Sequence, residues 1–117
     1  YDTVGYSINM KYQVNGLGLY SCQINDLTAL KELKQLTKLY LSVNQIYELT
    51  PLSDLKQLIE LDLSSNLIGE NYSLFDPRKK ISELIPLSNL KNLTYLSLNN
   101  NQICDISALK ILKELIW

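Results

Sequence analysis

Glu60 and Asp62 are the acidic pair in this sequence whose spacing could support acid–base chemistry. On an extended strand, residues two apart project from the same face, so the two carboxylates would lie side by side. Such a pair acts as general acid and general base when its surroundings separate the two pKa values. The neighbouring residues supply no metal ligand and no apolar wall for that purpose. We therefore expect solvated charges or contacts to a partner, and no catalytic residue.

A second set of carboxylates recurs along the chain and could bind a metal ion. Stacked about 5 Å apart, these carboxylates would attract Ca²⁺. Each also comes just before a short turn whose N-terminal end favours negative charge, and we favour this capping role. The chain contains no histidine, which removes the commonest acid–base catalyst and metal ligand. The sequence thus predicts no enzyme, no metal site and no cofactor. The carboxylates are Asp26, Glu48, Glu83 and Asp105.

Composition limits the partners and the compartment. The 117 residues include 11 basic and 12 acidic side chains, with a net charge of −1, so no nucleic-acid partner is expected. No apolar stretch is long enough for membrane insertion, and the first twelve residues lack the features of a signal peptide. The cysteines, Cys22 and Cys104, favour a reducing compartment such as the cytoplasm, while a cell-surface or secreted location stays open. The start at Tyr1 instead of methionine suggests a fragment or a processed product.

These residues are positioned by a repeat of 22 residues. When residues 33–68 are shifted by 22 places, Leu39 falls on Leu61 and Asn44 falls on Asn66. Such a period indicates structural units that stack on one another. The repeating positions are occupied by Leu39, Leu61 and Leu96, by Leu41, Leu63 and Leu98, and by Cys22, Asn44, Asn66 and Asn101.

The pattern LxxLxLxxN/CxI resembles the leucine-rich repeat, and its period is similar to the bacterial internalin-like or SDS22-like subclass. The resemblance implies an α/β fold. This fold would be a right-handed, curved solenoid, with a parallel β-sheet on the concave face and 3₁₀, short helical and loop returns on the convex face. Alternating leucines would point into the core. Asn44, Asn66 and Asn101 would turn inward to bond free backbone groups, and Cys22, at the same position, would be a buried thiol.

The whole chain is expected to be one leucine-rich-repeat domain. Residues 1–13 would be an atypical N-terminal half-repeat that caps the stack, because a terminal repeat has a neighbour on only one side. Four repeats would occupy residues 14–109, with a 13-residue insertion between Ile68 and Leu84. Residues 110–117 would form a C-terminal half-repeat, as at the end of a truncated array.

The resemblance implies that the concave face binds another protein. Tyrosines suit this role because they offer large amphipathic contacts at low entropic cost. The alternative is an ordinary solvated sheet face. The candidate residues on this face are Tyr20, Lys38, Tyr40, Glu60, Asp62, Tyr95, Ser97 and Asn99.

Residues 69–80 of the insertion are a second candidate contact, because an aromatic tip with a basic stem is what a partner's pocket could bind. The alternatives are a loop without function and a loop that packs back on the solenoid. Its candidate residues are Tyr72, Phe75, Arg78, Lys79 and Lys80.

Two functions are compatible with the sequence. The first is a non-enzymatic protein-protein interaction module whose partner is another protein. The alternative is a structural spacer or assembly segment that forms a homo-oligomer through the open ends of the solenoid.

Overall fold

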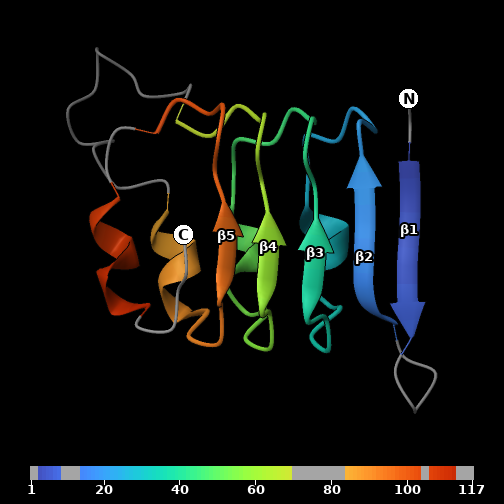
Figure 1. Cartoon of the computed structure of the whole chain (residues 1–117), viewed down its shortest axis with the longest axis horizontal. Helices are drawn as coiled ribbons and strands as arrows, with labels where there is room; N and C mark the ends of the chain where they lie inside the picture. Colours follow the sequence, from blue (N-terminus) through green and yellow to red (C-terminus); the bar gives the residue numbers. More distant parts are fainter. Residues whose placement is uncertain (1–2, 9–13, 70–83, 104–105, 113–117) are drawn as a thin grey trace.

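The computed structural model describes residues 3–8, 14–69, 84–103 and 106–112. In these residues the chain forms a five-stranded sheet whose strands follow one another in sequence order (Figure 1). Strands β2 to β5 are parallel, whereas β1 is antiparallel to β2. The strands are β1 (Thr3–Ile8), β2 (Val14–Tyr20), β3 (Lys38–Tyr40), β4 (Glu60–Asp62) and β5 (Tyr95–Ser97).

The strand register reproduces the sequence repeat. Leu39 lies opposite Leu61, and Leu61 lies opposite Leu96. The first pair is 22 residues apart and the second is 35 apart, yet both pairings are in register. The 13 additional residues between β4 and β5 therefore leave the register of these two strands unchanged.

Each of the parallel strands β2 to β5 is followed by a return that contains a 3₁₀ turn. Pro51 and Pro86 lie in the first two positions of their turns, where the N–H that proline lacks would have no partner within the turn. The turns are η1 (Thr28–Leu30), η2 (Thr50–Leu52), η4 (Ile85–Asn89) and η5 (Ser107–Ile111). In Figure 1, η1 and η2 lie behind the strands, and η4 and η5 lie beside β5 at the left of the view.

The core lies between the sheet and these turns. Leu39 and Leu41 face it from one rung, and Leu61 and Leu63 face it from the next, all with no exposed surface. Each such leucine stabilises the fold by roughly 1.5–3 kcal/mol on burial. The expected solenoid, with a parallel sheet on one side and short returns on the other, is confirmed. The core also includes the turn leucines Leu52, Leu55, Leu58, Leu87, Leu90 and Leu93.

The first strand is not part of the parallel array. Ile8 lies opposite Val14 in an antiparallel pair, while the equivalent position one period later, Leu30, ends the turn η1. Strand β1 thus covers the edge of β2 without repeating the parallel geometry. An uncovered edge would present a row of unpaired N–H and C=O groups, and the antiparallel strand satisfies them.

Gly69 marks the point where the chain leaves the third rung. It is buried and has a φ of +91°, a conformation that L side chains rarely adopt. A Cβ atom at this position would lie 2.2 Å from the carbonyl oxygen of Gln102. Only glycine fits here, because the backbone of the next rung passes directly against it. Residues 70–83, which hold most of the insertion, lie outside the described part of the chain.

Candidate protein-binding face

Buried asparagines hold the strand ends in place. The Nδ2 of Asn44 donates hydrogen bonds to the carbonyls of Leu41, in its own rung, at 3.0 Å and Leu19, in the preceding rung, at 2.8 Å. Its Oδ1 accepts hydrogen bonds from the backbone N–H of Ile24 at 3.0 Å and of Cys22 at 2.9 Å. One side chain therefore satisfies backbone groups of two rungs. The inward role that we expected for the asparagines is confirmed.

Each rung turns sharply just before its asparagine position. The turning residues adopt a left-handed conformation with φ of 55–57°, although none of them is glycine. This conformation costs about 1–2 kcal/mol per residue. Backbone bonds between rungs oppose that cost, such as Val43 N–H to Ser64 O at 3.0 Å. The sequence gives no sign of these turns, since glycine, the usual marker, is absent. The residues are Ser21, Val43, Ser65 and Asn100.

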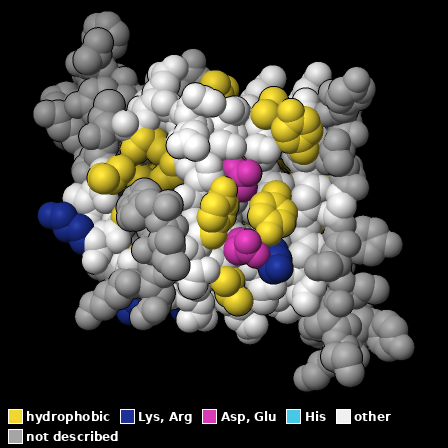
Figure 2. All heavy atoms as spheres, viewed as in Figure 1, with side chains coloured by type: hydrophobic (Ala, Val, Ile, Leu, Met, Phe, Trp, Pro, Cys, Tyr) yellow, Lys and Arg dark blue, Asp and Glu magenta, His cyan; other side chains and the backbone are white. Residues whose placement is uncertain are grey.

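The strand register brings the predicted binding residues into two rows across the outer face of the sheet. One row is Lys38, Glu60 and Tyr95 on β3, β4 and β5, and the other is Tyr40, Asp62 and Ser97 on the same strands. We call these six residues the sheet face. Figure 2 shows acidic side chains over the middle of the sheet with hydrophobic side chains on both sides.

Two further candidates lie beyond these rows. Tyr20 ends β2 opposite Thr3, and Asn99 follows the end of β5. Both are exposed. They belong to the same side of the sheet but lie past the ends of the rows.

Both carboxylates of the sheet face have polar partners. The Nζ of Lys38 lies 3.3 Å from the Glu60 carboxylate. The Oδ1 of Asp62 accepts hydrogen bonds from the N–H and Oγ of Ser64, at 2.9 and 2.7 Å. The Lys38 side chain is 54% exposed, so this ion pair stabilises the fold by at most about 1 kcal/mol. It can be broken at little cost when another charged group approaches.

The tyrosines of the sheet face are exposed to solvent. Tyr40 is 36% exposed and Tyr95 is 45% exposed. The pKa of Tyr40 is raised above its ordinary value of 10.0, first by partial burial and then by the charge of Glu60 and a hydrogen bond to it. Partial burial and the charge of Glu60 therefore both disfavour the phenolate form at this point of the sheet.

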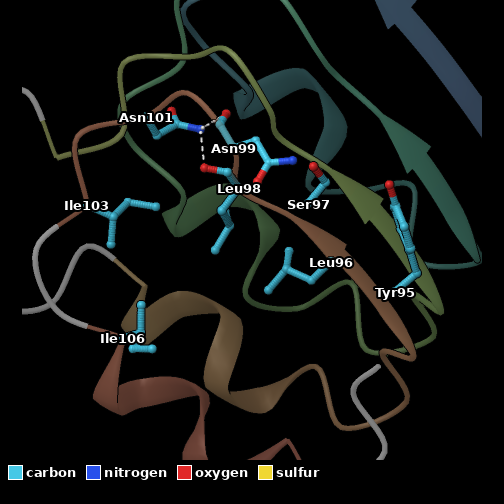
Figure 3. Close-up of a pocket in the computed structure, with 8 residues that line it drawn as sticks. All are labelled: Tyr95, Leu96, Ser97, Leu98, Asn99, Asn101, Ile103 and Ile106. Carbon is cyan, nitrogen blue, oxygen red and sulfur yellow. Dashed lines mark hydrogen bonds between the residues drawn. The ribbon is translucent and has the colours of Figure 1, made fainter. Parts of the chain in front are cut away.

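A hollow of about 350 Å³ lies beside β5, at the end of the sheet. Figure 3 shows Ile103 and Ile106 facing the same space as Leu96 and Leu98. Ile106 is 58% exposed. The hollow therefore offers apolar surface next to the sheet face, a feature that the sequence analysis did not single out.

The recurring carboxylates cap turns where the structure describes them. The Asp26 carboxylate accepts hydrogen bonds from the N–H of Thr28 at 2.9 Å and its hydroxyl at 2.6 Å. Glu48 accepts the same two bonds from Thr50, and the pKa of both carboxyls is lowered by them, the side-chain bond being the larger cause. Within the described ranges no group of three or more His, Cys, Asp or Glu residues could hold a metal ion. Glu83 and Asp105 lie outside those ranges.

Cys22 does not occupy the buried position that we predicted. It is half-buried, and its Sγ donates to the carbonyl of Tyr20 at 3.4 Å. Its rung follows the antiparallel strand β1, so no preceding parallel rung closes over the thiol. Its backbone N–H is instead satisfied by Asn44. Cys104 lies outside the described residues.

The candidate contact residues of the insertion lie in a stretch of the chain that the structure does not describe. Tyr72, Phe75, Arg78, Lys79 and Lys80 all fall in residues 70–83, outside the described part. No helix formed by the described residues has the length and apolar character needed to cross a membrane.

Family models and solved structures agree with this geometry. A model for two copies of the leucine-rich repeat matches residues 34–73, and a model for a single leucine-rich repeat matches residues 92–113. No curated protein matches the chain. The chain is similar to the crystal structure of internalin C2 from Listeria monocytogenes str. 4b F2365. The sequence identity is 34% and the TM-score 0.67, over 80% of this chain and 35% of internalin C2.

The internalin InlF from the same organism is also similar, with 33% identity and a TM-score of 0.67 over 80% of this chain and 24% of InlF. The chain belongs to the leucine-rich-repeat proteins and is internalin-like. Proteins of this kind are generally protein-interaction modules and are typically not enzymes. The chain spans about a third of internalin C2 and a quarter of InlF.

Proposed function

We propose that this chain is a protein-interaction module that binds a partner protein through its sheet face. The observation that carries the proposal is the pair of exposed tyrosines, Tyr40 on β3 and Tyr95 on β5, which flank β4 and are held by a fully buried leucine core. Rigid aromatic side chains surrounded by polar groups are typical anchors of protein interfaces. Tyr20 and Asn99 extend the same contact beyond the rows.

The test is to capture partners from the native source with the immobilised chain and with the Tyr40→Ala, Tyr95→Ala double variant. We expect the double variant to lose the partner. Tyr47→Ala is the matched control, because Tyr47 is 46% exposed but lies beside Glu48 and Pro51, in the return between β3 and β4. If the double variant captures the same protein as the wild type, the sheet face is not the binding site.

The insertion is proposed as a second contact to the same partner. Its candidate residues Tyr72, Phe75, Arg78, Lys79 and Lys80 combine aromatic and basic side chains. Residues 70–80 should be deleted and Gly69 kept, because no other residue fits its backbone. Lost capture with an unchanged melting temperature supports recognition. A lowered melting temperature instead supports a loop that packs on the solenoid.

Self-association is the second candidate function. The apolar hollow beside β5 favours it, since Ile103 and Ile106 are available to a second copy of the chain. Light scattering across a concentration range should then show a dimer that Ile106→Asp removes. A strict monomer at all concentrations would exclude this function.

A further inference from the structure

We infer that the partner presents an arginine side chain to the sheet face, where the guanidinium enters between Tyr40 and Tyr95 above the carboxylates of Glu60 and Asp62. This inference rests on the proposed function and specifies the chemistry of the partner. It assigns a cationic, planar group to the centre of the contact.

The spacing of the strands suits such a group. Tyr40 is on β3 and Tyr95 is on β5, with β4 between them. Neighbouring strands are about 4.8 Å apart, so the two tyrosine strands are separated by roughly 10 Å. A flat group in contact with a ring on each side needs about 7 Å between the rings. The tyrosines are also offset along the strands, because Tyr40 lies in the row of Asp62 and Tyr95 in the row of Glu60. Their rings must therefore lean across this diagonal, over β4, to contact one group, and Figure 2 shows hydrophobic side chains on both sides of the acidic ones.

The charge of the sheet face also favours a cation. Its charged residues are Lys38, Glu60 and Asp62, which leaves one net negative charge. The phenol of Tyr40 feels this field, because its pKa is raised by burial and then by Glu60, with smaller contributions from Tyr95 and Asp62. The negative charges of Glu60 and Asp62 that oppose a phenolate attract a guanidinium, whereas partial burial, the larger cause of the raised pKa, does not favour a cation. Tyrosine rings also attract cations through their faces.

Lys38 already uses part of this field. Its Nζ lies 3.3 Å from Glu60 while most of its side chain stays exposed. An exposed pair of this kind is weak. Arginine can displace it, because a guanidinium binds a carboxylate through two parallel hydrogen bonds and stacks on aromatic rings. Lys38 thus competes with the incoming arginine for the Glu60 carboxylate.

The first experiment titrates the chain with the blocked peptide Gly-Arg-Gly and follows the ring signals of Tyr40 and Tyr95 by NMR. We expect saturable shifts with a Kd on the order of 1–10 mM. The same peptide with citrulline has nearly the same shape but no charge, and it should bind at least about tenfold more weakly. The Tyr47 signal should not move.

Three variants test the roles of the charges. Glu60→Gln and Asp62→Asn should each weaken the peptide about 3- to 10-fold at low salt. Lys38→Gln should tighten it by about threefold, because the competing cation is removed. All three positions are on the surface, so the fold is retained. A merely structural role for Lys38 would not produce tighter binding.

Three results would overturn the inference. They are equal binding of the citrulline peptide, preferred binding of Gly-Glu-Gly, and the absence of any saturable shift. Preferred binding of Gly-Glu-Gly would indicate an anionic partner. The absence of any saturable shift would indicate a face without a cation site. These results are distinct from failure of the proposed function. If capture still requires Tyr40 and Tyr95 when the arginine peptide fails, the interface remains and only the arginine is wrong.

Discussion

The side-chain amide of Asn66 donates a 2.9 Å hydrogen bond to the carbonyl of Leu41, which belongs to the preceding rung. Its oxygen accepts a 3.0 Å hydrogen bond from the backbone N–H of Ile46, which lies in the return of that preceding rung. The same amide also bonds the carbonyls of Leu63 and Ser64. One buried side chain therefore joins two rungs and closes the bend after β4.

Asn66→Ala should lower the free energy of unfolding by about 2–4 kcal/mol. The reason is that the buried N–H of Ile46 loses its acceptor. The carbonyls of Leu41 and Leu63 each lose one of two donors and keep only Asn44 and Asn101, respectively. Urea unfolding measures the loss. Asn92→Ala is the control, since its exposed amide donates to the carbonyl of Lys56 at 3.2 Å. Equal losses of unfolding free energy in both variants would mean that the buried hydrogen bonds of Asn66 stabilise the fold no more than an exposed one.

Leu61→Ala should cost about 2–5 kcal/mol of stability, because the side chain has no exposed surface and its removal leaves a cavity between β4 and the turns. Ile59→Ala, at a site that is 39% exposed, should cost less than about 1 kcal/mol. Thermal melts of the two variants make the comparison. A negligible effect of Leu61→Ala would contradict its place in the core.

Gly69→Ala should destabilise the fold by about 2 kcal/mol or more, through the positive φ and the clash with the carbonyl of Gln102. Gly18→Ala is the matched control, because a Cβ there would meet nothing nearer than 3.8 Å. Its melting temperature should stay close to that of the wild type. Equal melting temperatures for the two variants would contradict the close approach of the two rungs at Gly69.

Glu48 should make stability depend on acid pH. Its pKa is lowered in the folded chain from the ordinary value of 4.5, so its contribution is complete above about pH 4.5 and is lost as the pH falls through the folded pKa. Glu48→Gln keeps an acceptor for Thr50 but does not titrate. The difference in Tm between wild type and variant should therefore shrink from pH 7 to pH 3. A constant difference would contradict the shift.

The raised pKa of Tyr40 should fall in the Glu60→Gln variant. The pKa should move toward 10.0 without reaching it, because partial burial is the larger cause and remains. The raised pKa also means that Tyr40 stabilises the fold below pH 10 and that this contribution is lost at higher pH. Titration of the tyrosine ring carbons by NMR measures both. An unchanged Tyr40 pKa would show that Glu60 has no electrostatic influence on the sheet face.

The sequence by itself determined the rungs, their order and their inward-facing residues. Alternation in Leu39 and Leu41 is a property of any strand, and stacking at a constant period needs only neighbouring repeats. The inward asparagines followed as well, because a buried amide must find partners and the bend supplies them. The six residues of the sheet face were predicted for the same reason, since equal positions in each repeat share one face.

Only the tertiary structure decided how the regular pattern ends and where it is interrupted. Strand β1 is antiparallel, and Cys22 is half-buried beside it, because the edge of a sheet can be closed in more than one way. Gly69 must be glycine because Gln102, far along the chain, passes against it. The pairing of Lys38 with Glu60 likewise depends on side-chain positions between strands, which the period of the sequence does not specify.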